Sequence, residues 1–190
     1  MELLNHKDPN DEELWLQLRL GSQGAFTELF RRYYTKLYDY GTHLVSHREG
    51  LLKDTIQDLF AELWAKKEKL SDVQYVKTYL FKSFRRKLLR ELKKQRRFLF
   101  VFDHTHIQPD AFSFSIEDLT IATEMKEEIR LKVTEALEGL TVSQREIIYL
   151  KFKDNLDYEE IEDITQLKYQ SIRNSVHRAL KVLRNVLNTN

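Results

Sequence analysis

The scarcity of glycine and proline constrains the fold of this chain more than any other feature of its sequence. The 190 residues include only five glycines and two prolines, and neither type occurs between Leu51 and Gln108 or between Leu140 and Asn190. A β-rich or α/β chain needs turn residues roughly every ten positions, whereas helices run through such stretches without them. The sequence therefore predicts an all-α fold.

Apolar side chains recur at helical spacing along the N-terminal half. Ile56, Leu59, Phe60, Leu63 and Trp64 follow the i, i+3, i+4, i+7, i+8 pattern that marks one face of a helix. Three more stretches share this spacing, at Leu14, Trp15 and Leu18, at Phe26, Leu29, Phe30, Tyr33, Tyr34 and Leu37, and at Tyr75, Tyr79, Leu80, Phe84, Leu88 and Leu92. We therefore expect about four helices before Arg97, the first of them capped by Asp11.

A linker divides the chain. The helical period stops at Phe98 and returns from about Ile121, and the stretch between them contains Pro109. We expect two small helical domains joined by this linker, with boundaries at residues 11–97, 98–125 and 126–188.

Capping boxes, each an N-cap paired with an acid or amide three residues later, mark the helix starts of the C-terminal half. The pairs are Thr141 with Gln144, Ser143 with Glu146, and Asp157 with Glu160. A break at 165–168 then separates a short helix from a longer one, whose apolar positions are Ile172, Val176, Ala179, Leu180, Leu183 and Leu187. This order of short helix, turn and longer helix predicts a helix-turn-helix.

The net charge of +1 hides three strongly charged blocks. Residues 82–97 carry nine basic side chains and one acidic side chain, and residues 168–190 carry five basic side chains and no acid. Residues 110–139, by contrast, carry eight acids and three bases. Each basic block alone also fits a solvated helix face. Because dense cations repel one another unless phosphates neutralise them, two such blocks on separate halves favour two contacts with DNA.

Several function classes lack the residues they need. The chain has no cysteine, which excludes disulfides, thiol catalysis and cysteine-based metal sites. It has no apolar run of about 18 residues that could span a membrane and no signal-peptide pattern, so we expect a cytoplasmic protein without membrane insertion. No Walker loop, dinucleotide fingerprint or nucleophile elbow is present, and we expect neither an enzyme nor a cofactor. His43 and His47 have a spacing that can hold zinc, but no third ligand accompanies them, so we expect no metal site.

The chain resembles the bacterial RNA polymerase sigma factors of the extracytoplasmic-function class. The motifs that carry the resemblance are AFTELFRRYY at 25–34, DTIQDLFAELW at 54–64, LTVSQRE at 140–146, YEEI at 158–161 and SIRNSVHRA at 171–179. Their order and spacing cover nearly the whole chain. The resemblance implies a protein that binds core RNA polymerase and promoter DNA and starts transcription at chosen promoters, reading the −10 element with its N-terminal domain and the −35 element with its helix-turn-helix.

The resemblance also implies three sets of functional residues. The polymerase-binding set is Asp54, Gln57, Asp58 and Phe60, although Phe60 and Trp64 also fit the core. The −10 set is Tyr79, Lys82, Arg85, Arg86, Lys87 and Arg90, because melted DNA needs a cationic groove with aromatic rings or a base pocket. The −35 set is Ser171, Arg173, Asn174, Ser175, His177, Arg178 and Lys181, which lie on the recognition helix.

The acidic linker and an inhibitor protein are further expectations. Family members are often held inactive by an anti-sigma protein, which makes such a protein a candidate partner. The negative charge of the linker could also shield the basic helices, and deletion of residues 103–118 should then raise the DNA affinity of the isolated chain. The alternative from a different class is a helix-turn-helix regulator that binds duplex DNA without polymerase, and co-purification with core polymerase separates the two.

Overall fold

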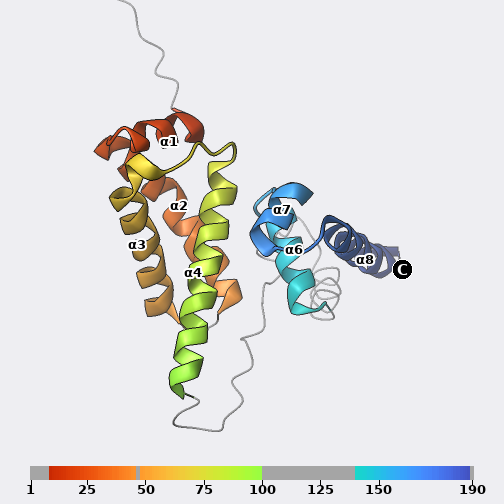
Figure 1. The fold of residues 1–190 in the computed structure, drawn as a ribbon. Helices are drawn as coiled ribbons and strands as arrows, with labels where there is room; N and C mark the ends of the chain where they lie inside the picture. Colours follow the sequence, from red (N-terminus) through yellow and green to blue (C-terminus); the bar gives the residue numbers. More distant parts are fainter. Residues whose placement is uncertain (1–8, 46–47, 100–139, 189–190) are drawn as a thin grey trace, which may run out of the picture.

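All regular structure in the described part of the chain is helical. The computed structural model describes residues 9–45, 48–99 and 140–188. Its helices are α1 (Asp11–Arg19), α2 (Gln23–Leu44), α3 (Glu49–Ala65), the 3-10 turn η1 (Lys67–Lys69), α4 (Val76–Leu99), α6 (Val142–Phe152), α7 (Tyr158–Thr165) and α8 (Tyr169–Asn188). Figure 1 shows α1 to α4 as one bundle and α6 to α8 as a second group beside α4. The predicted all-α class with two small helical domains is confirmed.

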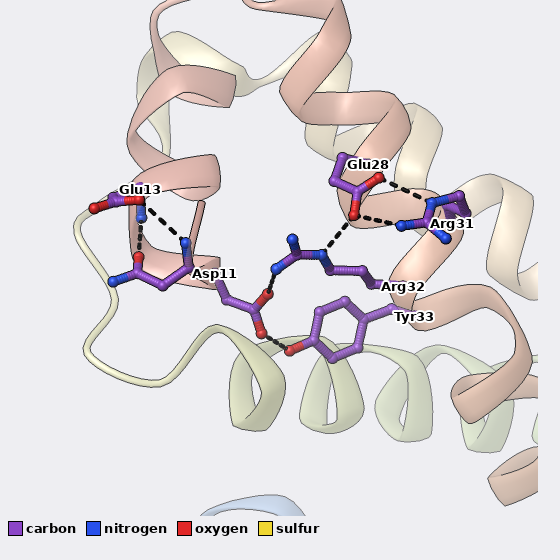
Figure 2. Close-up of polar contacts among 7 residues, drawn as sticks. Asp11, Glu13, Glu28, Arg31, Arg32 and Tyr33 are labelled. Carbon is purple, nitrogen blue, oxygen red and sulfur yellow. Dashed lines mark hydrogen bonds and ion pairs between the residues drawn. The ribbon is translucent and has the colours of Figure 1, made fainter. Parts of the chain in front are cut away.

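The start of α1 corrects one prediction. Asn10, rather than Asp11, is the N-cap: its side chain accepts a hydrogen bond from the Glu13 backbone N–H, and the Glu13 carboxylate accepts one from the Asn10 N–H. Asp11 lies in the first turn, where its carboxylate binds Arg32 and the Tyr33 hydroxyl of α2 (Figure 2). The residue expected to cap α1 therefore ties α1 to α2.

A second polar cluster lies on the same face of α2. The Glu28 carboxylate accepts hydrogen bonds from Arg31 and Arg32 at 2.7–2.9 Å (Figure 2). These bonds, with the bond from Arg31 as the larger effect, lower the pKa of Glu28 from 4.5 to about 2. Arg32 thus joins the Glu28 pair to the Asp11 pair.

A small residue lets the helices of the N-terminal bundle approach closely. A Cβ at Gly41 of α2 would lie 2.7 Å from Leu52 of α3 and 2.9 Å from Phe84 of α4. A side chain at this position would therefore force the Leu52 or Phe84 side chain to move. Most of the core around it consists of apolar positions predicted from the helical spacing, chiefly Leu14, Leu18, Leu29, Leu37, Ile56, Leu59, Leu63, Leu80, Phe84 and Leu88. Leu52, which that spacing did not include, is buried as well.

Two aromatic residues at the start of α4 differ from what the apolar spacing indicated. Tyr75 was expected on the buried face of the fourth helix, but it precedes α4 and its side chain is 51% exposed. Phe81 is fully buried instead. The reason is that α4 begins at Val76, and the face defined by Val76, Leu80 and Phe84 includes Phe81 and not Tyr75.

The C-terminal group forms the predicted helix-turn-helix. The Thr141–Gln144 and Asp157–Glu160 capping boxes are both present, at the starts of α6 and α7. α7 ends at Thr165, Gln166 adopts the left-handed conformation with φ of 62°, and α8 begins at Tyr169. Buried side chains hold the motif together, namely Ile161, Ile164, Ile172, Val176 and Ala179.

Two predictions for the C-terminal group are wrong. Leu180 was expected in the core but is 44% exposed, because the apolar face of α8 runs through Ile172, Val176 and Ala179. The Ser143–Glu146 box does not form, because the Glu146 side chain is buried against the N-terminal bundle. The side chains of Leu183 and Leu187, and the linker after Leu99, lie outside the described residues.

Candidate nucleic-acid interface

Helix α4 carries most of the predicted −10 residues on two adjacent stripes. Tyr79, Ser83, Arg86 and Arg90 follow one another at i, i+4, i+7 and i+11, and form the first stripe. The second stripe consists of Thr78, Lys82 and Arg85, again at i, i+4 and i+7. The two stripes have different surroundings.

The first stripe borders two surface hollows. Hollows of about 390 Å³ and about 140 Å³ share Tyr79, Ser83 and Arg86 in their linings. Arg90 lines the smaller hollow, together with Lys87 and the side of α3. Arg86 and Arg90 are exposed, so two guanidinium groups stand beside cavities of the size of a small ring system.

Aromatic and polar contacts fix the walls of these hollows. The Tyr79 ring packs edge-on against Trp15 of α1, with ring centroids 5.0 Å apart. The Trp15 indole N–H donates to the Ser71 carbonyl at 3.1 Å, which holds the segment between η1 and α4. That segment contributes Val73, Gln74 and the exposed Tyr75 to the larger hollow. Gln74 and Ser83 were not predicted as site residues, although the gap in helical spacing between Trp64 and Tyr75 marks the segment that contains Gln74 as a loop.

Lys87 is paired with an acid of its own domain. Its ammonium group binds the Glu62 carboxylate of α3 at 2.8 Å, and this hydrogen bond lowers the pKa of Glu62. The pair closes one side of the smaller hollow.

The second stripe is covered by the C-terminal group. Thr78 donates to Glu160 at 2.7 Å, and Lys82 binds Asp163, both on α7. Arg85 makes two hydrogen bonds to Glu146 of α6, at 2.7 and 3.2 Å. Of the predicted −10 residues, Lys82 and Arg85 therefore have carboxylate partners from the other domain.

The Arg85–Glu146 pair is enclosed. The Glu146 side chain is 5% exposed, and the Tyr40 hydroxyl of α2 donates to the same carboxylate at 2.6 Å. Burial, with the nearby Glu146 charge, raises the pKa of Tyr40 well above 10. Burial alone would lower the pKa of Arg85, but the hydrogen bonds to Glu146 and its charge raise it above the usual value. Both donors therefore keep their protons and Glu146 has two strong partners.

The predicted −35 residues lie together on the outer side of α8. Ser171, Arg173, Asn174, His177, Arg178 and Lys181 are exposed, and Ser175 is half-buried. The buried side of α8, at Ile172, Val176 and Ala179, faces α6 and α7. The N-terminal turns of the second helix of the motif are therefore open to a duplex.

The predicted polymerase-binding residues divide into a surface row and a core residue. Asp54, Gln57 and Asp58 are exposed along one side of α3, and no ion pair with another described residue engages the two aspartates. Phe60 is 2% exposed and packs edge-on against Phe26 and Phe30. The Phe60 ring is therefore part of the core, as its helical spacing also allowed, and its role as a polymerase contact stays a prediction.

Comparisons with known proteins agree with this layout. The family model "Sigma-70 region 2" matches residues 29–98, and the model "Sigma-70, region 4" matches residues 130–183. The chain belongs to the sigma-70 family. The resemblance to sigma factors of the extracytoplasmic-function class is confirmed, and this sigma factor binds RNA polymerase and directs promoter-specific initiation.

Solved structures share the fold. The sigma factor RpoE in complex with the anti-sigma factor NepR, from Bartonella quintana, aligns with a TM-score of 0.59 at 21% identity, covering 87% of this chain and 98% of its own. CnrH, in complex with the cytosolic domain of CnrY, aligns with a TM-score of 0.57 at 19% identity, covering 95% and 98%. A search of curated protein sequences finds no significant match.

The match to region 2 gives the N-terminal bundle of this sigma factor a role. A regulator that binds duplex DNA without polymerase would have no role for that bundle, so the match favours the sigma factor over this alternative.

The remaining candidate residues carry no sign of a metal site. The His43 ring lies 4.6 Å from the Tyr149 ring, and His47 is outside the described residues. Within the described ranges no cluster of three metal-ligating side chains occurs. No helix in those ranges is both long and apolar enough to cross a membrane.

Proposed function

We propose that this sigma factor divides its work among three surfaces: α3 binds core polymerase, the two stripes of α4 together hold melted −10 DNA, and α8 reads the −35 duplex. The proposal assigns the N-terminal domain to residues 11–97, the linker to 98–125 and the C-terminal domain to 126–188. The observation that carries it is the stripe of Tyr79, Arg86 and Arg90 along two hollows on a helix of the region 2 match.

The α4 stripe has the chemistry that unpaired DNA requires. Arg86 and Arg90 supply cations for phosphates, and Tyr75 and Tyr79 supply ring faces at the larger hollow. A cavity of about 390 Å³ next to cations and tyrosines can receive an unstacked base. Gln74 could hydrogen-bond such a base because its amide both donates and accepts.

The exposed row on α8 has the chemistry of duplex recognition. Arginine pairs with guanine and asparagine with adenine in the major groove, so Arg173 and Asn174 in the early turns are the proposed base readers. Arg178 and Lys181 follow one and two turns later and are the proposed phosphate contacts.

The polar row on α3 fits a basic helical partner. Two aspartates flank an amide over one turn, and the core behind them holds α3 rigidly through Ile56 and Phe60. The charge reversals Asp54→Lys and Asp58→Lys together should reduce co-purification with core polymerase. Glu12→Lys with Glu68→Lys, which reverses two other exposed charges of the same domain, is the matched control.

The remaining expectations follow from the same assignment. The chain performs no chemistry of its own, since nucleotidyl transfer belongs to the polymerase, and it works in the cytoplasm, where the polymerase is. An anti-sigma protein is a proposed partner, because both structural relatives were solved with a protein bound, in one case a named anti-sigma factor.

Arg86→Ala in a reconstituted holoenzyme tests the −10 assignment. Loss of one charged contact to melted DNA should lower promoter opening about tenfold, with holoenzyme assembly and −35 duplex binding unchanged. Permanganate reactivity of unpaired thymines measures opening. Arg31→Ala, an exposed arginine on α2 that lines neither hollow, is the control. Equal opening by both variants would remove the α4 assignment.

A further inference from the structure

The contact between the two domains is built from opposite charges. Four polar side chains of α4 each bind one acid of the C-terminal group. The pairs are Lys77 with Asp154, Thr78 with Glu160, Lys82 with Asp163, and Arg85 with Glu146. The acids come from α6, from α7 and from the turn between them, so each of these three parts of the C-terminal group places an acid against α4.

The centre of this contact is buried. Glu146 finds its three hydrogen bonds entirely on the N-terminal domain, from Tyr40 and Arg85. Beside it the Tyr149 ring stacks on Tyr40, with centroids 6.1 Å apart, and meets His43. A buried carboxylate is strongly destabilising unless it is paired. Its placement opposite two matching donors therefore indicates a specific closed arrangement.

The closed arrangement covers part of the proposed −10 surface. Lys82 and Arg85 are both bound by carboxylates, and Asp163 stands in the wall of the 390 Å³ hollow beside Lys82 and Arg86. Carboxylate and phosphate oxygens accept the same hydrogen bonds from arginine and lysine. DNA phosphates and these acids therefore cannot occupy the second stripe together.

We propose that the free chain inhibits itself, with Glu146 and Asp163 acting as phosphate mimics on α4, so that the C-terminal domain must leave α4 before melted promoter DNA can bind there. The recognition helix α8 stays exposed in the closed form. The masking rests on the proposed DNA-binding role of α4, whereas the closure does not. By this inference, the acids that mask α4 belong to the DNA-reading domain itself.

Because the chain has no cysteine, two introduced cysteines can carry spin labels at chosen places. Ala61→Cys on α3 and Val142→Cys at the start of α6 are exposed and lie one in each domain. Electron–electron resonance on the doubly labelled full chain then reports the separation of the domains without DNA. Affinity for a single-stranded thymidine oligonucleotide is measured on the same protein.

Asp163→Lys sets two cations against each other across the contact. Glu159→Lys places the same charge on the same helix, at an exposed position without a described partner. We expect Asp163→Lys to lengthen the interdomain distance and to raise single-strand affinity about tenfold over the control, as removal of a state that hides nine-tenths of the sites would do. Glu146→Gln, which weakens the buried pair, should shift the distance in the same direction.

The interdomain distance tests the closure, and the single-strand affinity tests the masking. Distances unchanged in both Asp163→Lys and Glu146→Gln would overturn the closure, since no DNA enters that measurement. A longer distance without a gain in single-strand affinity over Glu159→Lys would overturn the masking. The Arg86→Ala experiment judges independently whether α4 is the DNA-binding surface.

Discussion

The two cationic helices of this sigma factor differ in what the rest of the chain places against them. On α4, Lys82, Arg85 and Lys87 are paired with acids, two of them from the other domain. On α8, no described acid pairs with Arg173, Arg178 or Lys181. A run of basic residues in a sequence therefore measures local charge, and does not measure how much of that charge is available to a ligand.

The difference has a simple physical origin. Residues 168–190 contain no acid, and α8 turns only its apolar side toward α6 and α7. α4, in contrast, lies between the acidic side of α3 at Glu62 and the acidic face of α6 and α7. Helix α4 can be regulated by closure, while α8 can meet duplex DNA in either arrangement.

Removal of Arg85 should have the largest effect on the contact that covers α4. Arg85→Ala leaves Glu146 buried beside Tyr40 alone, at a cost of about 3–5 kcal/mol to the closed arrangement. Amide hydrogen exchange of α6 in the free chain should accordingly rise. Arg86→Ala, one residue along the same helix, should leave α6 as protected as in the parent protein. Equal protection in both variants would show that the pair does not hold the domains together.

Changes on α8 should act regardless of closure. Arg173→Ala or Asn174→Ala should cost about 1–3 kcal/mol in −35 duplex binding and relax the sequence preference at one position. The loss should be the same in the parent chain and with Asp163→Lys added, as measured by fluorescence anisotropy on matched and mismatched duplexes. A loss that depended on Asp163→Lys would mean that closure also restricts α8.

A milder change should weaken closure without opening the chain fully. Tyr40→Phe removes one donor from Glu146 but leaves Arg85 in place, so the expected cost is about 1 kcal/mol. The interdomain distance distribution should gain a minor, longer component. Tyr38→Phe, on the same helix and without a described hydrogen bond, should not change it.

The smallest effect is expected far from the contact between the domains. The pKa of Glu28 is about 2 in the folded chain against 4.5 ordinarily, so its stabilising effect is present above pH 4.5 and disappears as the pH falls toward 2. In Glu28→Gln, the loss of helical signal from α1 and α2 between pH 4.5 and 2 should therefore be smaller, as followed by circular dichroism. Glu12→Gln is the control, and the interdomain distance at neutral pH should be the same in both.

Local patterns in the sequence were sufficient for most of the fold. Helical spacing predicted the buried Ile56, Leu59, Phe60 and Leu63 of α3, because burial on one face repeats every three to four residues. It missed the buried Leu52 and Thr55 and included Trp64, which is half-buried. Capping boxes fixed the starts of α6 and α7 for the same reason, since the interacting groups are three residues apart. The recognition helix followed as well, except at the exposed Leu180, because its exposed and buried sides are set largely by its own period.

Residues with two possible partners were the ones that the sequence misassigned. Glu146 satisfied a local capping pattern, but Arg85 and Tyr40, 61 and 106 positions away along the chain, bind it instead. Asp11 could cap a helix, yet Arg32 and Tyr33 take its carboxylate. Tyr75 was misplaced as well, because the apolar period alone does not show that α4 begins only at Val76.

The sequence by itself determined the helices, the helix-turn-helix and the positions of the charges, because each depends on neighbours within about one turn. The tertiary structure alone decided which charges meet. Ion pairs between Lys82 and Asp163 or Arg85 and Glu146 join helices of different domains, and no local period encodes such a partner. Availability for DNA is therefore a property of the folded chain, and the charge that makes it possible is a property of the sequence.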